Sequence, residues 1–247
     1  MGIDFSKVYH QSSKDGSRGH FPILENSDNW PESWKIQEYK VYPRFPKIPL
    51  SDMPIQKLPA NFFHLVSKRR SERDYGANQS LLIDEIAVLL RYSCGISERK
   101  VFPGRAQPSA GERFPIEMYI FVLVPGKNLP AGLYHYDVKS HRLDVLRQNV
   151  LTKEDIRRLF RFEWVEKASA VLVMTAVFGR NQIKYGDRGY RYILIEAGHI
   201  GQNISLVSLA LDLKCCALGG TRDQDIEEFL DIDGINESVV YAFSIGR

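Results

Sequence analysis

The chain has 247 residues, of which 44% are hydrophobic and 26% charged, a balance typical of a globular protein with a full core. Its net charge of +3 is too small to indicate a nucleic-acid-binding protein. Three cysteines without a Cys-x-x-Cys pair argue against a disulfide framework and against a structural zinc site. Neither a signal peptide nor a run of 18 apolar residues is present, so we expect a cytoplasmic protein without a membrane span.

Residues 1–54 are predicted to form an extended arm. Prolines are frequent there, and no helical or strand period persists through residue 60. Four aromatic residues are the expected anchors of this arm on the rest of the protein: Trp30, Trp34, Tyr39 and Tyr42. A floppy linker is the alternative, which so many aromatic residues disfavour.

The first half of the body, from residue 55, predicts two helices, a loop and three strands. The helices are residues 61–70 and residues 82–93, the second with Ile86, Leu89 and Leu90 inside and Gly95 as its stop. A long basic loop over 97–115 precedes a strand over 117–124. Residues 132–137 and 141–146 are predicted to form a hairpin with alternating faces.

The second half of the body contains the longest periodic segment. A helix over 152–160 with Thr152 as its N-cap precedes an apolar strand over 168–177. A charged loop over 180–189 then leads into a long helix over 190–213. The remaining predicted elements are a buried strand over 215–218, an acidic helix over 223–230 and a strand over 239–245. Because helices and strands interleave without a regular βαβ rhythm, we expect an α+β fold with a mixed central sheet flanked by helices.

The long helix is predicted to lie at the centre of the protein. Apolar residues recur at three- and four-residue steps through Ile193, Ala197, Ile200 and Ile204, and further leucines spread the apolar surface around the helix. A helix this apolar is buried in a core or a subunit interface. Glu196, His199 and Asn203 form a polar stripe that needs hydrogen-bonding partners there, with His199 expected to be buried.

Lys184 and Tyr185 are the sharpest candidates for chemistry. They lie in the predicted loop among Arg180, Arg188 and Arg191, and neighbouring cations should lower the pKa of both groups. Either group could then carry protons. A solvated basic loop without chemistry is the alternative.

Three other clusters each have two interpretations. Arg69, Arg70, Ser71 and Arg73 could clamp a phosphate or simply end a helix with cations. The small-residue loop 108–111 and the pair 219–220 could offer backbone to a flat ring or an anion, or could be ordinary turns. His135 and His141 lack a third ligand and are interpreted as structural. No P-loop, Rossmann, zincin or α/β-hydrolase motif is present.

In this order, these segments resemble the nitroreductase superfamily of flavin enzymes. They resemble more narrowly the SagB-type dehydrogenases, which include the azoline oxidases of thiazole/oxazole-modified peptide pathways. The stretches that carry the resemblance are residues 69–73, 107–111, 117–119, 132–137, 184–191, 196–199 and 202–203. It covers about residues 55–247.

The resemblance implies an intertwined homodimer that binds FMN at its interface. Arg69, Arg70, Ser71 and Arg73 would hold the phosphate and the polar edge of the flavin, and Arg247 is a further candidate contact to the phosphate. Other residues would line the flavin or face its reactive edge: Pro108, Ser109, Ala110 and Gly111, from the other subunit, and Leu218, Gly219 and Gly220.

The implied reaction is oxidation of a thiazoline or oxazoline in a modified peptide or a related small molecule. The flavin would accept a hydride while Lys184 or Tyr185 takes the proton. A cyclodehydratase is one candidate partner, whereas nucleic acid, membrane and metal are not expected. The alternatives are an NAD(P)H-dependent nitro- or quinone reductase, and a flavin-binding partner of a modifying complex that does not turn over.

Overall fold

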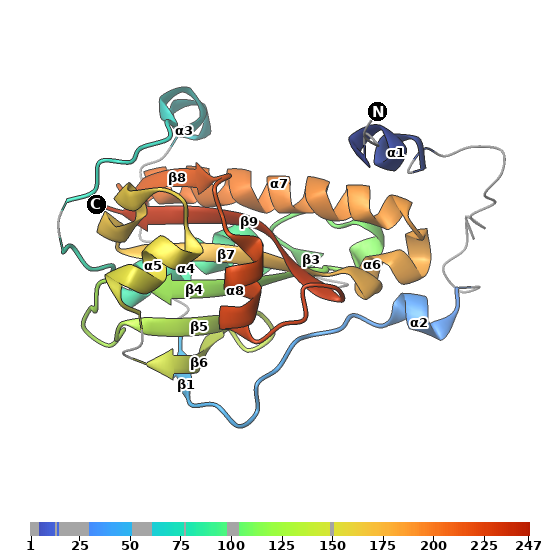
Figure 1. The fold of residues 1–247 in the computed structure, drawn as a ribbon, viewed down its shortest axis with the longest axis horizontal. Coiled ribbons are helices and arrows are strands. Elements are labelled where there is room, and N and C mark those ends of the chain that lie inside the picture. Colours follow the sequence, from blue (N-terminus) through green and yellow to red (C-terminus); the bar gives the residue numbers. More distant parts are fainter. Residues whose placement is uncertain are drawn as a thin grey trace.

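A computed structural model describes residues 5–12, 14, 30–50, 61–76, 78–97, 104–148 and 151–247. Its centre is a seven-stranded sheet in the order β1-β6-β5-β4-β7-β9-β8 (Figure 1). The strands are β1 (Lys47–Pro49), β4 (Ile116–Val122), β5 (Gly132–Asp137), β6 (Arg142–Gln148), β7 (Ala170–Val177), β8 (Lys214–Leu218) and β9 (Glu237–Gly246). A separate two-stranded ribbon joins β2 (Ile96–Ser97) to β3 (Gly104–Arg105).

Helices cover both faces of this sheet, which confirms the predicted α+β fold class. They are α1 (Phe5–Ser12), α2 (Glu32–Lys35), α3 (Phe62–Lys68), α4 (Ile83–Cys94), α5 (Lys153–Leu159), α6 (Phe178–Tyr185), α7 (Arg188–Ala210) and α8 (Asp223–Leu230). Thr152 caps α5 and Gly95 caps α4, as predicted. None of the described helices combines the length and the apolar character that crossing a bilayer requires.

The sheet differs from the expected mixed sheet, because every pairing between its described strands is antiparallel. β7 and β8 do run in the same direction, joined by the crossover through α6 and α7. β9, however, lies between them and pairs with both in the opposite direction. A crossover connection therefore exists without a parallel pair.

The core has two layers, one on each face of the sheet. On one face, Ile193, Ala197, Ile200 and Ile204 of α7 are buried, as predicted, and they pack with the apolar side of α4. On the other face, α5 and α8 cover a second cluster. The hairpin β5–β6 was expected to alternate between core and solvent, yet every residue of β5 is buried because both faces of the sheet are covered.

The predicted loop over 180–189 is wrong for its first half, which forms α6 and ends at Gly186 in a left-handed conformation (φ 53°). The buried residues of α6 are Arg180 and Asn181, so its inward face is polar and gives no hydrophobic period. α1, α2 and β1 were also not predicted. α2 and β1 have only 4 and 3 residues, too few to show a period.

The described part of the arm lies on the body. β1 joins the sheet beside β6, and Lys47 forms an ion pair with Asp144. Lys40 forms an ion pair with Glu237, and the Tyr42 hydroxyl lies 3.0 Å from that of Tyr119.

Candidate functional site

Lys184 and Tyr185 end helix α6 and contact the loop 108–111 of the same chain. Gly111 has a left-handed backbone (φ 62°), and a Cβ added there would lie 2.7 Å from Tyr185 Oη and 3.1 Å from Lys184 Nζ. Only glycine allows this close approach. The structure thus brings together two motifs that lie far apart in the sequence.

A buried carboxyl group of α7 holds the loop 108–111 in place. Ser109 Oγ donates a hydrogen bond to Glu196 Oε2 (2.5 Å), and Gln107 Nε2 donates to Glu196 Oε1 (3.2 Å). Burial raises the pKa of Glu196 to about 7, although both hydrogen bonds oppose the shift. Glu196 was predicted only as part of a polar stripe, and its position next to the loop was missed.

The other two residues of the polar stripe, Asn203 and His199, lie in different environments. Asn203 Nδ2 donates to the backbone carbonyl of Ser93 (3.2 Å), which is the kind of partner that burial requires. His199 is exposed, so its predicted burial is wrong. Among the described residues, nothing covers the side of the helix on which His199 lies.

Lys184 is covered by the arm. Its ammonium nitrogen lies 3.2 Å from the ring centroid of Trp30 and 5.6 Å from that of Trp34. Burial, and then the charge of Arg113, lower the pKa of Lys184. The indole faces favour the ammonium form and oppose part of this shift.

The pKa of Tyr185 is raised, which corrects the predicted lowering. Burial raises it, Tyr192 adds to the shift, and Arg113 opposes it. The three arginines that were expected to act on the pair have other contacts. Arg180 forms a buried ion pair with Glu117, Arg188 Nε donates to Tyr192 Oη (2.8 Å), and Arg191 contacts His10. A side chain's neighbours in sequence were therefore a poor guide to its neighbours in space.

The two histidines of the hairpin are structural, as predicted. His135 is fully buried between two carboxylates, with Nε2 2.9 Å from Glu117 and Nδ1 3.1 Å from Asp144. His141 Nδ1 lies 2.8 Å from the Tyr136 hydroxyl.

The basic segment 69–73 lies near the other end of α7. The Glu72 N–H donates to the Cys215 carbonyl on β8 (3.0 Å), so the segment runs beside the edge of the sheet. The Arg73 guanidinium lies 5.8 Å from the ring of Trp164, which stacks on Phe162 at 5.6 Å. Phe162 in turn covers Gly220, where an added Cβ would lie 2.5 Å from its ring. Phe162 and Trp164 were not identified from the sequence.

This end of the molecule carries uncompensated positive charge. Within the described residues, Arg69, Arg70 and Arg73 form no ion pair with a carboxylate. A Cβ added at Gly219 would meet no described atom within 4 Å, so this backbone is open. Guanidinium groups without a carboxylate partner, beside exposed backbone, are suited to a phosphorylated, flat ligand such as FMN. Arg247, by contrast, forms an ion pair with Glu85.

The two groups of site residues lie at opposite ends of α7. We call Trp30, Trp34, 108–111 and Lys184–Tyr185 the lysine end, and 69–73, Phe162, Trp164 and 218–220 the arginine end. A helix of 23 residues is about 34 Å long. One chain alone therefore does not bring the two ends together.

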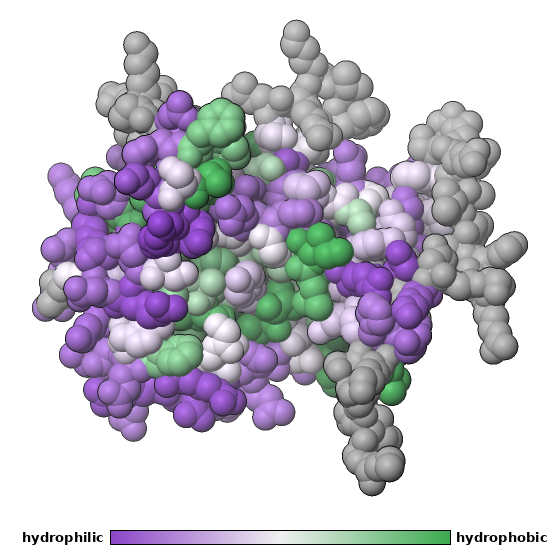
Figure 2. Space-filling model, turned by 90° about the horizontal axis from the view of Figure 1, so that it is seen from above, coloured by the Kyte–Doolittle hydropathy of each residue, from purple (hydrophilic) through white to green (hydrophobic). Residues whose placement is uncertain are grey.

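The outward side of α7 carries the apolar residues Leu194 and Ile195 next to exposed Gly198, His199 and Gln202. Leu194 and Ile195 are 40% and 49% exposed. Figure 2 shows apolar residues gathered on this face of the molecule, over α7. Apolar residues therefore continue from the buried face of the helix onto this side, and the described residues leave Leu194 and Ile195 exposed.

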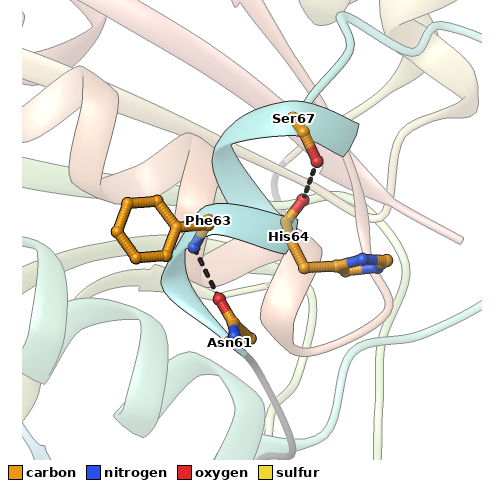
Figure 3. A pocket seen from close by; sticks show the side chains of 4 residues that line it. All are labelled: Asn61, Phe63, His64 and Ser67. Carbon is orange, nitrogen blue, oxygen red and sulfur yellow. Dashed lines mark hydrogen bonds between the residues drawn. The ribbon is translucent and has the colours of Figure 1, made fainter.

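A hollow on α3 lies just before the basic segment (Figure 3). It is lined by Asn61, Phe63, His64 and Ser67. Phe63 and His64 point to opposite sides of the helix, and the hydrogen bonds drawn are a helix cap and an internal turn contact. This hollow brings no candidate catalytic groups together.

Most of the chain matches a known protein family. The nitroreductase family profile matches residues 66–247. The chain is 31% identical over 166 residues to the MJ1384 protein of Methanocaldococcus jannaschii, which is assigned as a nitroreductase, and the match covers 67% of this chain and 81% of that protein.

Two relatives are processing proteins, one for trifolitoxin and one for microcin B17. The chain is 28% identical over 186 residues to the trifolitoxin-processing protein TfxB of Rhizobium leguminosarum bv. trifolii (68% of this chain, 48% of TfxB). It is 31% identical over 134 residues to the microcin B17-processing protein McbC of Escherichia coli (52% and 49%). The matches span about half of each of these two proteins.

Solved structures share the fold. A protein from Anabaena variabilis, assigned as a nitroreductase, has a TM-score of 0.71 at 23% identity, over 97% of this chain and 45% of that one. A chain of the E. coli microcin synthetase McbBCD complex with truncated pro-MccB17 has a TM-score of 0.62 at 23% identity (98% and 91%). A protein from Exiguobacterium sibiricum in complex with FMN, assigned as a nitroreductase, has a TM-score of 0.53 at 17% identity (76% and 88%).

Proposed function

Because the chain belongs to the nitroreductase family, we propose that it is an FMN-dependent oxidoreductase of the SagB type that oxidises azoline rings in a modified peptide. The observation that carries this proposal is the contact of Lys184 and Tyr185 with Gly111. It puts a base, a phenol and a small-residue loop at one place. The sequence likeness to two peptide-processing proteins supports the substrate class.

The two polar groups of the lysine end take different roles. Burial and Arg113 lower the pKa of Lys184, so its amine is the better proton acceptor. The pKa of Tyr185 is raised, so its phenol stays protonated and serves as a hydrogen-bond donor that orients the substrate. Lys184 would remove the ring proton, and the chemistry that bound FMN supplies is acceptance of a hydride.

We place FMN between two copies of the chain. Arg69, Arg70, Ser71 and Arg73 of one copy would hold the phosphate and the polar edge, with 218–220 beside the ring. The loop 108–111 and Lys184 would come from the second copy, because one chain keeps them at the opposite end of α7. A two-fold axis across the outward side of α7 would bring both kinds of end together twice.

The oxidation itself can be tested by mass spectrometry. A thiazoline- or oxazoline-containing peptide, incubated with the FMN-loaded protein and oxygen, should lose about two daltons as one proton and one hydride leave. The cyclodehydratase that makes such a ring is the partner class to include. A loaded, folded protein that leaves thiazoline, oxazoline and cyclodehydratase-coupled peptides unchanged would contradict the proposal.

The two-copy site has a separate test. Ile195→Asp places a charge on the outward side of α7 without touching the core, and it should convert a dimer to monomers that no longer retain FMN. Size-exclusion chromatography with light scattering and the flavin absorbance measure both effects. Exposed Ile235, which lies far from α7 in the sequence, gives the control Ile235→Asp, expected to stay dimeric and yellow. A monomeric wild-type protein that binds FMN tightly would refute this arrangement.

Reduction of nitro or quinone compounds by NAD(P)H is the second candidate. The match to the M. jannaschii protein assigned as a nitroreductase covers 81% of that protein and favours it. Rapid bleaching of the flavin by NADH or NADPH, followed by reoxidation with a quinone, would support this reductase. Slow bleaching together with azoline oxidation would support the oxidase.

A further inference from the structure

The amine of Lys184 is enclosed by aromatic rings from the arm. Trp30 and Trp34 lie 6.5 Å apart with their planes at 64°, and both rings face Lys184 Nζ. The 3.2 Å distance to the Trp30 centroid puts the nitrogen directly on the ring face. Gly111 lies against the same nitrogen, as its hypothetical Cβ shows. The amine is therefore held between the indoles and the glycine backbone.

Arg113 links the arm segment that carries Trp34 to helix α6. Its Nη1 donates to the carbonyl oxygens of Trp34 (2.9 Å) and Ile36 (2.7 Å), and its Nε donates to that of Arg180 (2.8 Å). Arg180 precedes Lys184 by one turn of α6. Because Arg113 is buried, with 2% of its surface exposed, this link between arm and helix is shielded from water.

We propose that Trp30 and Trp34 are positioning residues that hold Lys184 for proton transfer, with Arg113 joining them to α6. We call the two indoles the aromatic cradle. The indoles cover the amine, and their ring faces stabilise the ammonium ion that forms when Lys184 accepts a proton. The arm segment 30–36 is then a part of the site.

The cradle can be measured without turnover, through the reactivity of Lys184. Wild-type protein is labelled with limiting acetic anhydride between pH 6 and pH 10, and each acetylated lysine is quantified by peptide mass spectrometry. Exposed Lys127 and Lys153 are the internal references. Cover by the cradle should make Lys184 label about fivefold more slowly than these references at neutral pH.

A series of substitutions at Trp30 separates two effects: the interaction of the indole face with the Lys184 ammonium ion, and the shielding of the amine from solvent. Trp30→Ala should raise the Lys184 labelling rate to about that of the references, whereas Trp30→Phe should stay close to wild type. Trp30→Leu keeps an apolar cover and removes the ring face, so it should lower kcat with KM unchanged and shift the acidic limb of the kcat profile, the limb that a proton acceptor controls. Phe45→Ala, another exposed arm aromatic, is the matched control and should change neither quantity.

The catalytic readout rests on the proposed function, while the labelling readout does not. Wild-type Lys184 that labels as fast as Lys127 and Lys153 would overturn the cradle, as would an unchanged labelling rate in Trp30→Ala that is folded by circular dichroism. Slow labelling that Trp30→Ala relieves, in a protein without azoline oxidation, would uphold the cradle and reject the proposed reaction.

Discussion

The lysine end and the arginine end of α7 are built in opposite ways. At the lysine end the chain supplies its own cover, with two indoles on the amine and a buried carboxyl group behind the loop 108–111. At the arginine end three guanidinium groups have no carboxylate partner among the described residues, and Gly219 faces open space. The proposed roles account for this difference, because proton transfer needs a site prepared in advance, whereas anion binding needs charge that is not paired within the protein.

The sharpest way to break this comparison is to remove the amine. Lys184→Met keeps the length and the apolar contact with Trp30 but cannot accept a proton, so kcat for azoline oxidation should fall by about 10²–10⁴-fold. FMN content, measured by absorbance, should not change, because the arginine end is untouched. The control is Lys153→Met, at an exposed position of α5. Full activity of Lys184→Met would remove the lysine end from the chemistry.

The second largest effect concerns the buried carboxyl group of Glu196. Since its pKa is raised to about 7, the folded protein binds more protons than the unfolded chain between pH 4.5 and pH 7. Stability should therefore fall as pH rises through this window. Glu196→Gln lacks this titration, so its unfolding free energy relative to wild type should increase by about 3 kcal/mol between pH 5 and pH 8.

Urea unfolding of both proteins at the two pH values measures this difference, and other titrating groups cancel in the comparison. A pH-independent difference between wild type and Glu196→Gln would show that Glu196 titrates normally. The raised pKa of Glu196 would then no longer distinguish the lysine end from the arginine end.

At the arginine end a single charge should matter less. Arg70→Gln removes one exposed guanidinium and should weaken FMN binding by about tenfold, as expected for one charged hydrogen bond. Fluorescence titration of the apoprotein with FMN gives the Kd. Exposed Arg44 on the arm provides the matched control Arg44→Gln, and an equal loss in both variants would point to overall charge instead of a clamp.

The smallest effect is expected away from both ends. The Thr152 side chain accepts a hydrogen bond from the Asp155 N–H (3.1 Å) at the start of α5. Thr152→Ala should lower the unfolding free energy by about 1 kcal/mol. Both FMN affinity and kcat should stay at wild-type values, and a change in either would couple α5 to a site it does not contact.

Elements with long, regular periods could be predicted from the sequence. The steps from Ile193 to Ile204 gave α7 and its buried face, and the apolar run of β7 gave a central strand. α6 could not be found in this way, because its inward face carries Arg180 and Asn181. The antiparallel sheet depends on β9 entering between β7 and β8, which no local pattern encodes.

For the candidate site too, part could be predicted from the sequence and part could not. Residue types at fixed spacing identified Lys184–Tyr185 and the loop 108–111 as candidates. Their contact with each other, and the contact of Trp30 with Lys184, are long-range packing events. The pKa of Tyr185 was predicted in the wrong direction because burial, which the sequence does not display, outweighs nearby charge.

The position of β9 also bears on how the chain folds during synthesis. β7 and β8 are both complete before β9 is made, yet they can be joined in one sheet only through it. A ribosome-bound intermediate that ends before residue 237 would expose two unpaired strand edges rich in apolar residues. We expect such a nascent chain to bind holdase chaperones, and to release them once β9 pairs with β7 and β8.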